Sequence, residues 1–230
     1  MFDNLDFDVI RRSLPYLFLD GMSFTLMLTG LSALGGLVFG TMIALMRLSS
    51  YRLMGRIAGL YVDFMRSLPL VLVIFWFYFL VPYIGQWLTG ASRPIRVGAF
   101  TSSLVTFIMF EAAYFSEIMR AGIQSISKGQ PAAASALGLT YSQSMRYIVL
   151  PQAFRNMLPV LLTQTIVLFQ DTSLVYVLSI PDFLGAASKV AQRDGRLVEM
   201  YLFAAVVYFV ISCVASYGVR RLQARIAIVR

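Results

Sequence analysis

The sequence predicts an all-α membrane protein with five transmembrane helices, and its composition supports this prediction in two ways. Of the 230 residues, 59% are hydrophobic, and the mean hydropathy is +0.76. A soluble domain of this length could not bury so much apolar surface. The apolar residues form long runs rather than the short alternating segments of a transmembrane β-barrel, so helices are the expected spanning elements.

Five apolar segments are long enough to cross about 30 Å of hydrocarbon as helices. We predict spans at residues 21–46, 60–81, 98–120, 156–178 and 197–219. The first span carries no charge, and Gly30, Gly36 and Gly40 provide small surfaces for helix packing. In the second, Pro69 should kink the helix or mark its first turn. Residues 82–97 are expected to form a loop.

Residues 1–20 contain four aspartates and only a short apolar stretch. A signal peptide has a basic start and a longer apolar core, so we expect a retained segment. The predicted organisation is an extracytoplasmic segment at 1–20, a five-helix membrane domain at 21–222 and a cytoplasmic tail at 223–230.

The basic residues indicate the orientation. Of the 19 lysines and arginines, 12 lie on the side that holds the 121–155 loop and the C-terminus, and 7 lie on the other side. The positive-inside rule therefore places that loop and the C-terminus in the cytoplasm, and the N-terminus outside it. The net charge of +8 favours contact with anionic lipid of the bilayer over contact with nucleic acid.

Charged and polar residues inside spans are costly and mark candidate sites. Glu111 and Asp171 could bind the ammonium group of an amino acid, while side-chain amides and hydroxyls could bind its carboxylates. The candidate substrate path comprises Glu111, Gln164, Gln170, Asp171, Thr172 and Ser173. The alternative is that these residues only form hydrogen bonds between helices.

Two charge pairs lie at helix ends with a spacing of three residues. Asp63 with Arg66, and Glu117 with Arg120, can each pair on a helix surface. We interpret them as gates or as structural ion pairs at helix ends. The absence of histidine excludes Ser-His and Cys-His catalytic sites and histidine-based metal sites, so we expect no catalytic residue and no metal site. There is also no P-loop motif for ATP.

The connection at residues 121–155 carries its own helix signals. Pro131 suits the first turn of a helix, and Gly138 suits the left-handed position beyond a helix end. Thr140 and Gln143 are spaced for a capping box at the start of a second helix. The segment therefore predicts helix, glycine turn, helix, although a solvated loop that only joins two spans is the alternative. Pro151 disfavours a helical residue before it and predicts a bend.

One pattern in this connection resembles the EAA loop of ABC importer permeases. It consists of Ala132, Ala133, Ala134, Gly138, Ile148, Leu150 and Pro151. Ala132 stands where that motif has its glutamate. The flanking segments F-E-A-A-Y-F-S-E-I-M-R and L-P-Q-A-F-R are similar to the polar amino acid branch of these permeases, and most similar to permease subunits of glutamate/aspartate importers.

The resemblance implies a type I ABC importer permease fold and a transport subunit, not an enzyme, in the bacterial inner membrane. It implies that the loop docks on a separate ABC ATPase dimer, which binds the ATP, while this chain binds no cofactor. It also implies a second permease subunit, either a related chain or a second copy, and an extracytoplasmic amino-acid-binding protein. The expected substrates are glutamate and aspartate.

Two other functions are compatible with the residues alone. An ion-coupled secondary amino acid transporter could use Glu111 or Asp171 as its coupling site, although such transporters usually contain internal repeats. An intramembrane hydrolase could use the same two carboxylates as a dyad, but the sequence has no obvious nucleophile–base pair.

Overall fold

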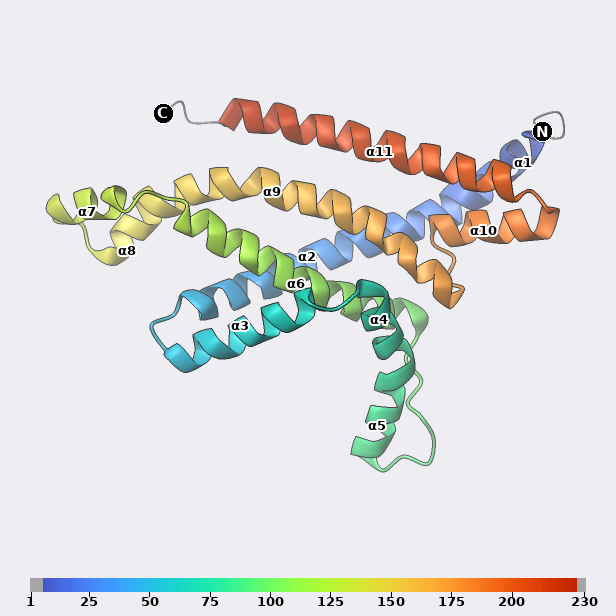
Figure 1. Ribbon diagram of the computed structural model, residues 1–230, viewed down its shortest axis with the longest axis horizontal. Coiled ribbons are helices and arrows are strands. Elements are labelled where there is room, and N and C mark those ends of the chain that lie inside the picture. Colours follow the sequence, from blue (N-terminus) through green and yellow to red (C-terminus); the bar gives the residue numbers. More distant parts are fainter. Residues whose placement is uncertain (1–5, 227–230) are drawn as a thin grey trace. The chain divides into compact units, whose positions relative to one another are not determined.

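The computed structural model describes residues 6–226, and every element in this part of the chain is helical (Figure 1). In chain order the elements are α1 (Asp8–Pro15), the π-helix η1 (Tyr16–Met22), α2 (Ser23–Leu48), α3 (Arg52–Arg66), α4 (Leu70–Phe75), the π-helix η2 (Trp76–Leu80), α5 (Val81–Thr89), α6 (Ala99–Gln124), α7 (Gly129–Ala136), α8 (Tyr141–Ser144), the π-helix η3 (Met145–Val149), α9 (Leu150–Asp171), the 3₁₀-helix η4 (Thr172–Leu178), α10 (Phe183–Asp194) and α11 (Leu197–Ile226).

Five helical stretches are long and apolar enough to cross a membrane, which confirms the predicted number of spans. They are Asp8–Leu48, Leu70–Thr89, Ala99–Gln124, Tyr141–Leu178 and Leu197–Ile226. The first stretch begins at Asp8 and continues through residue 21 without a break. The division of the chain at residues 20 and 222 by membrane side stays a prediction, and residues 1–5 and 227–230 of the two terminal segments lie outside the described residues.

The second predicted span is wrong in its bounds. The candidate span begins at Leu70 rather than Leu60, because Pro69 has an extended backbone with ψ 128° and precedes the first turn of α4. The residues before it form the separate helix α3. The predicted loop at 82–97 is also wrong in part, since α5 continues to Thr89. Pro82 lies in the first turn of α5, directly after the π-helix η2.

Each of the three π-helices adjoins a proline. Pro15 precedes η1, while Pro82 and Pro151 follow shortly after η2 and η3. A proline ring within a helix clashes with the carbonyl group four residues earlier. For Pro82 and Pro151 that carbonyl lies inside the π-helix, where the wider turn moves it away from the ring. The wider turns therefore allow the helices to continue through these prolines.

The described residues form two compact units, and the first comprises residues 6–34, 68–108 and 166–214. One of its cores contains Phe183, Ala186 and Ala187 of α10, packed with Leu17 of η1 and Met200 of α11. Gly21 allows α10 to approach η1, because a Cβ atom at this glycine would lie 2.9 Å from Cβ of Ala186.

Asp182 begins α10 as its N-cap and is fully buried. Its carboxylate accepts the backbone N–H groups of Leu184 and Gly185, each at 3.0 Å. Thr25 Oγ1 accepts the N–H of Phe183 at 3.0 Å. Burial raises the pKa of Asp182 to about 7, although the N–H groups act in the opposite direction.

The second unit comprises residues 35–67, 109–165 and 215–226. Within it, α2 packs on α6 through glycines. A Cβ atom at Gly36 would lie 2.8 Å from Cβ of Glu111, and one at Gly40 would lie 2.9 Å from Cβ of Phe115. Gly30, in contrast, has no atom within 4 Å of such a Cβ. The predicted small packing surface is therefore present at Gly36 and Gly40.

Candidate functional site

The connection between α6 and α9 contains the predicted helix–turn–helix (Figure 1). Pro131 lies in the first turn of α7, and Gly138 has a φ of 80°. Gln143 N–H donates to Thr140 Oγ1 at 3.3 Å, and Thr140 N–H donates to Gln143 Oε1 at 2.8 Å, which completes the capping box of α8. Local chemistry was sufficient to predict this segment, because each signal acts within a few residues.

This helix–turn–helix and the π-helix η3 that follows it expose apolar side chains. Leu137 is 80% exposed, Tyr141 81% and Tyr147 64%. Of the alanine block, Ala132 and Ala133 are exposed, whereas Ala134 is buried. Large exposed apolar side chains beside small residues make this segment a candidate for a protein–protein contact. We call the surface formed by Ala132, Ala133, Leu137, Gly138, Tyr141 and Tyr147 the loop surface.

The bend predicted at Pro151 is wrong. Leu150 is helical, with φ −61° and ψ −41°, and α9 begins there. The π-helix η3 lies directly before it, and Leu150 N–H donates to the carbonyl of Met145, five residues earlier. The wider turn accommodates the proline, so α8, η3 and α9 form a continuous helical stretch. Ile148 is half-buried, and Leu150 and Pro151 are exposed.

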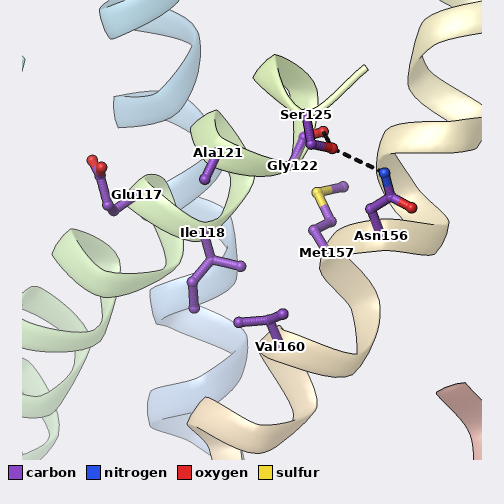
Figure 2. A pocket seen from close by; sticks show the side chains of 8 residues that line it. All are labelled: Glu117, Ile118, Ala121, Gly122, Ser125, Asn156, Met157 and Val160. Carbon is purple, nitrogen blue, oxygen red and sulfur yellow. Dashed lines mark hydrogen bonds between the residues drawn. The ribbon is translucent and has the colours of Figure 1, made fainter. Parts of the chain in front are cut away.

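At the base of the loop, α6 and α9 are held together. Asn156 Nδ2 donates to Ser125 Oγ at 2.9 Å (Figure 2). A Cβ atom at Gly122 would lie 2.8 Å from Cβ of Met157, so the two helices approach closely there. A pocket of about 320 Å³ lies beside this contact. It is lined by Glu117, Ile118, Ala121, Gly122, Ser125, Asn156, Met157 and Val160 (Figure 2).

Glu117 forms ion pairs with two arginines. One is Arg120 on the same helix, as the spacing predicts, and Arg120 Nε also donates to Glu117 Oε2 at 3.2 Å. The other is Arg47 of α2, which the sequence analysis did not assign to it. These residues are 70 positions apart in the chain. The signal for Arg47 was its place at the same predicted membrane face as Glu117.

Asp63 and Arg66 are both exposed on α3, and no ion pair joins them within residues 6–226. Arg66 instead lies over the ring of Tyr114 on α6, with Cζ 5.3 Å from the ring centroid. Such a distance is within the range of a cation–π interaction.

Glu111 and Gln164 of the predicted substrate path lie together. Gln164 Nε2 donates to Glu111 Oε1 at 3.2 Å, and Glu111 is only 1% exposed. The contact joins α6 to α9 within the second unit. A hydrogen-bonded carboxylate and amide inside spans can stabilise helix packing and can also bind a polar solute.

The other predicted path residues belong to the first unit. Gln170 Nε2 donates to Ser212 Oγ of α11 at 2.9 Å, a partner that the sequence analysis missed. Thr172 is buried and donates to the carbonyl of Phe169 at 2.7 Å. The side chains of Asp171 and Ser173 are half-buried and form no hydrogen bond within residues 6–226. Asp171 is therefore a partly buried carboxylate without a hydrogen-bond partner among residues 6–226.

Residues 36–228 match the family described as binding-protein-dependent transport system inner membrane component. This chain belongs to that family. The match includes the whole loop surface, four of the five candidate spans and the end of the first, so this permease is a transport component rather than an enzyme. Membership favours an ABC importer over the ion-coupled transporter, and it implies ATPase and binding-protein partners in general.

Known permeases align with almost the entire chain. A glutamate/aspartate import permease protein, GltK of Escherichia coli O6:H1, is 56% identical over 96% of this chain and 98% of its own length. A probable amino-acid ABC transporter permease protein, YckA of Bacillus subtilis, is 37% identical over 89% of this chain and 86% of its own. A crystal structure of an amino acid ABC transporter with histidines has a TM-score of 0.87 and 32% identity, and the alignment covers 96% of this chain and 99% of that one. The type I permease fold is thereby confirmed.

Proposed function

We propose that this permease carries glutamate and aspartate into the cell, driven by ATP hydrolysis on a separate ABC ATPase dimer. The observation that supports these substrates is the 56% identity to a glutamate/aspartate import permease over nearly the whole chain. The proposed assembly also contains a second permease subunit, a related chain or a second copy, and an extracytoplasmic binding protein. The N-terminus would lie outside the cytoplasm and the C-terminus inside it, in the bacterial inner membrane.

The loop surface is the proposed contact with the ATPase. Its apolar side chains are exposed, and its backbone is fixed by the capping box and by the hydrogen bond at its base. Residues 118–170 contain Arg120, Lys128, Arg146 and Arg155 but no aspartate or glutamate. A surface that is apolar and basic fits a partner cleft that is apolar with acidic side chains at its rim. Ala132, in place of the motif glutamate, supplies no charge to this contact.

The substrate is tested by the ATPase activity of the purified assembly in lipid vesicles. Liganded binding protein is added with each polar amino acid in turn. We expect glutamate and aspartate to stimulate ATP hydrolysis and glutamine and arginine not to do so. Stimulation by basic or amide amino acids alone would keep the importer and reject the proposed substrates. If no ATPase subunit purifies with this chain, the proposed contact is wrong.

The contact itself is tested by a pair of matched substitutions. Tyr141→Asp places a charge on the loop surface, whereas Tyr51→Asp makes the same change at a tyrosine that is 74% exposed in the short connection between α2 and α3. We expect Tyr141→Asp to lower ATPase retention and uptake strongly, and Tyr51→Asp to leave both near the unchanged level. Gly138→Asp should act like Tyr141→Asp, because a φ of 80° disfavours any other residue. Equal retention in all variants would contradict docking at this surface.

A further inference from the structure

Among the described arginines, Arg66, Arg146 and Arg221 each lie over a tyrosine ring, and the ring under Arg66 belongs to another helix. Arg47 and Arg120 form ion pairs with Glu117. Arg66 forms no ion pair or hydrogen bond through its side chain within the described residues, and it is exposed. Its guanidinium lies against the face of Tyr114. A cation–π contact occupies the plane of the group and leaves the N–H donors at its edge available.

The contacts of α3 place this guanidinium beside the middle part of α6. Tyr61 Oη, five residues before Arg66 in α3, donates to the carbonyl of Met109 at 2.5 Å. Met109 and Tyr114 are both well inside α6, which spans Ala99–Gln124. The ring of Tyr114 also packs on the buried Phe110, with centroids 5.2 Å apart, so the ring is itself held in place. Arg66 is therefore fixed by a helix that crosses the membrane.

A guanidinium held against a spanning helix is costly to expose to lipid. The surroundings that favour it are a water-filled path or another protein chain. Glu111 lies one turn before Tyr114 on α6 and is held by Gln164. The same stretch of the second unit thus carries a fixed cation and a fixed carboxylate, which are the two charge types that a zwitterionic amino acid requires.

We propose that Arg66 binds a carboxylate of the transported amino acid during its passage through the permease. The inference rests on the proposed function, which supplies the solute. The guanidinium presents paired N–H donors whose geometry matches a carboxylate. The sequence analysis left Arg66 out of the candidate substrate path, because it assigned this residue to a helix-end pair with Asp63.

The test measures retention of radiolabelled glutamate by the complete permease–ATPase complex in lipid nanodiscs, without binding protein. The variants are Arg66→Gln, Arg66→Lys and, as a control, Arg52→Gln, which changes an exposed arginine at the start of the same helix. Loss of a charged hydrogen-bond partner predicts about tenfold to hundredfold weaker retention for Arg66→Gln. Arg66→Lys should be intermediate, and Arg52→Gln should be unchanged.

Competition by glutamine and by the α-amide of glutamate shows which carboxylate Arg66 binds. If Arg66→Gln abolishes the preference for glutamate over glutamine, the side-chain carboxylate is bound. If Arg66→Gln weakens the binding of all competitors that keep the α-carboxylate to the same degree, Arg66 binds the α-carboxylate. Either result supports the inference.

Three results would overturn it. Two are unchanged retention by Arg66→Gln and no retention by the unsubstituted complex, each while glutamate still stimulates the ATPase through the binding protein. In both cases the proposed function would stand without this site. The third is loss of the partner chains from Arg66→Gln during purification, which would make Arg66 a contact between subunits. Failure of glutamate to stimulate the unsubstituted assembly would instead reject the proposed function.

Discussion

Replacing Gly36 by alanine should separate α2 from α6 at Glu111. The new Cβ would lie 2.8 Å from Cβ of Glu111, about 0.6 Å inside the 3.4 Å at which ordinary contacts begin. The contacted atom is next to the backbone of α6, so it cannot move away by rotating a flexible side chain. Overpacking of this kind costs about 1–3 kcal/mol. The shift also displaces the carboxylate that Gln164 holds, so uptake should decrease.

Gly30→Ala is the matched control, because Gly30 lies in the same helix with nothing within 4 Å of the added Cβ. Both substitutions gain the same helix propensity, roughly 0.5–1 kcal/mol. The difference between the two variants therefore isolates the overpacking cost of about 1–3 kcal/mol. The assay is the apparent thermal unfolding midpoint of the purified permease complex, where we expect Gly36→Ala to lie several degrees below Gly30→Ala. Equal midpoints and equal uptake would refute the packing argument.

Three further changes test other contacts. Burial raises the pKa of Asp182 to about 7, so its carboxyl group holds the proton more tightly in the folded chain than in the unfolded chain. The stability of the fold should therefore fall as pH rises from about 4 to 7. Asp182→Asn should flatten this pH dependence of the unfolding midpoint between about pH 5 and pH 8. Glu117→Gln leaves two partly buried arginines without their carboxylate and should cost roughly 1–3 kcal/mol in the same assay, whereas Asp63→Asn, at an exposed site without an ion pair, should cost almost nothing. Thr140→Ala removes the cap of α8 and should cost roughly 0.5–2 kcal/mol locally, seen as faster amide hydrogen exchange in α8, with Thr140→Ser near the unchanged rate.

The parts of the fold that the sequence predicts well depend on short-range chemistry. The number of spans follows from apolar length, and the helix–turn–helix of the loop follows from Gly138 and the Thr140–Gln143 capping box. In each case the residues that decide the structure lie within one or two turns of the segment that they shape.

The predictions that were wrong, or that found only half of a contact, involve prolines and distant partners. Pro82 and Pro151 indicate a loop and a bend by local preference, but a π-helix before each one accommodates the ring within a helix. The contact between Glu117 and Arg47 bridges 70 positions, and Gln170 finds Ser212 on another helix. Spacing rules describe neighbours on one helix, so they identified Arg120 but not these partners.

The π-helix η3 determines the direction in which the loop surface faces. A turn that holds one extra residue rotates everything before it by about 100° relative to an unbroken α-helix. The rotational position of Tyr141 around the axis of α9 therefore depends on the π-helix Met145–Val149 and on the proline that follows it. Substituting Pro151 alone would let this segment tighten into α-helix and would turn the surface of α8 aside without changing any residue on it. The direction in which the loop surface faces and the residues that form this surface are thus encoded in separate parts of the chain.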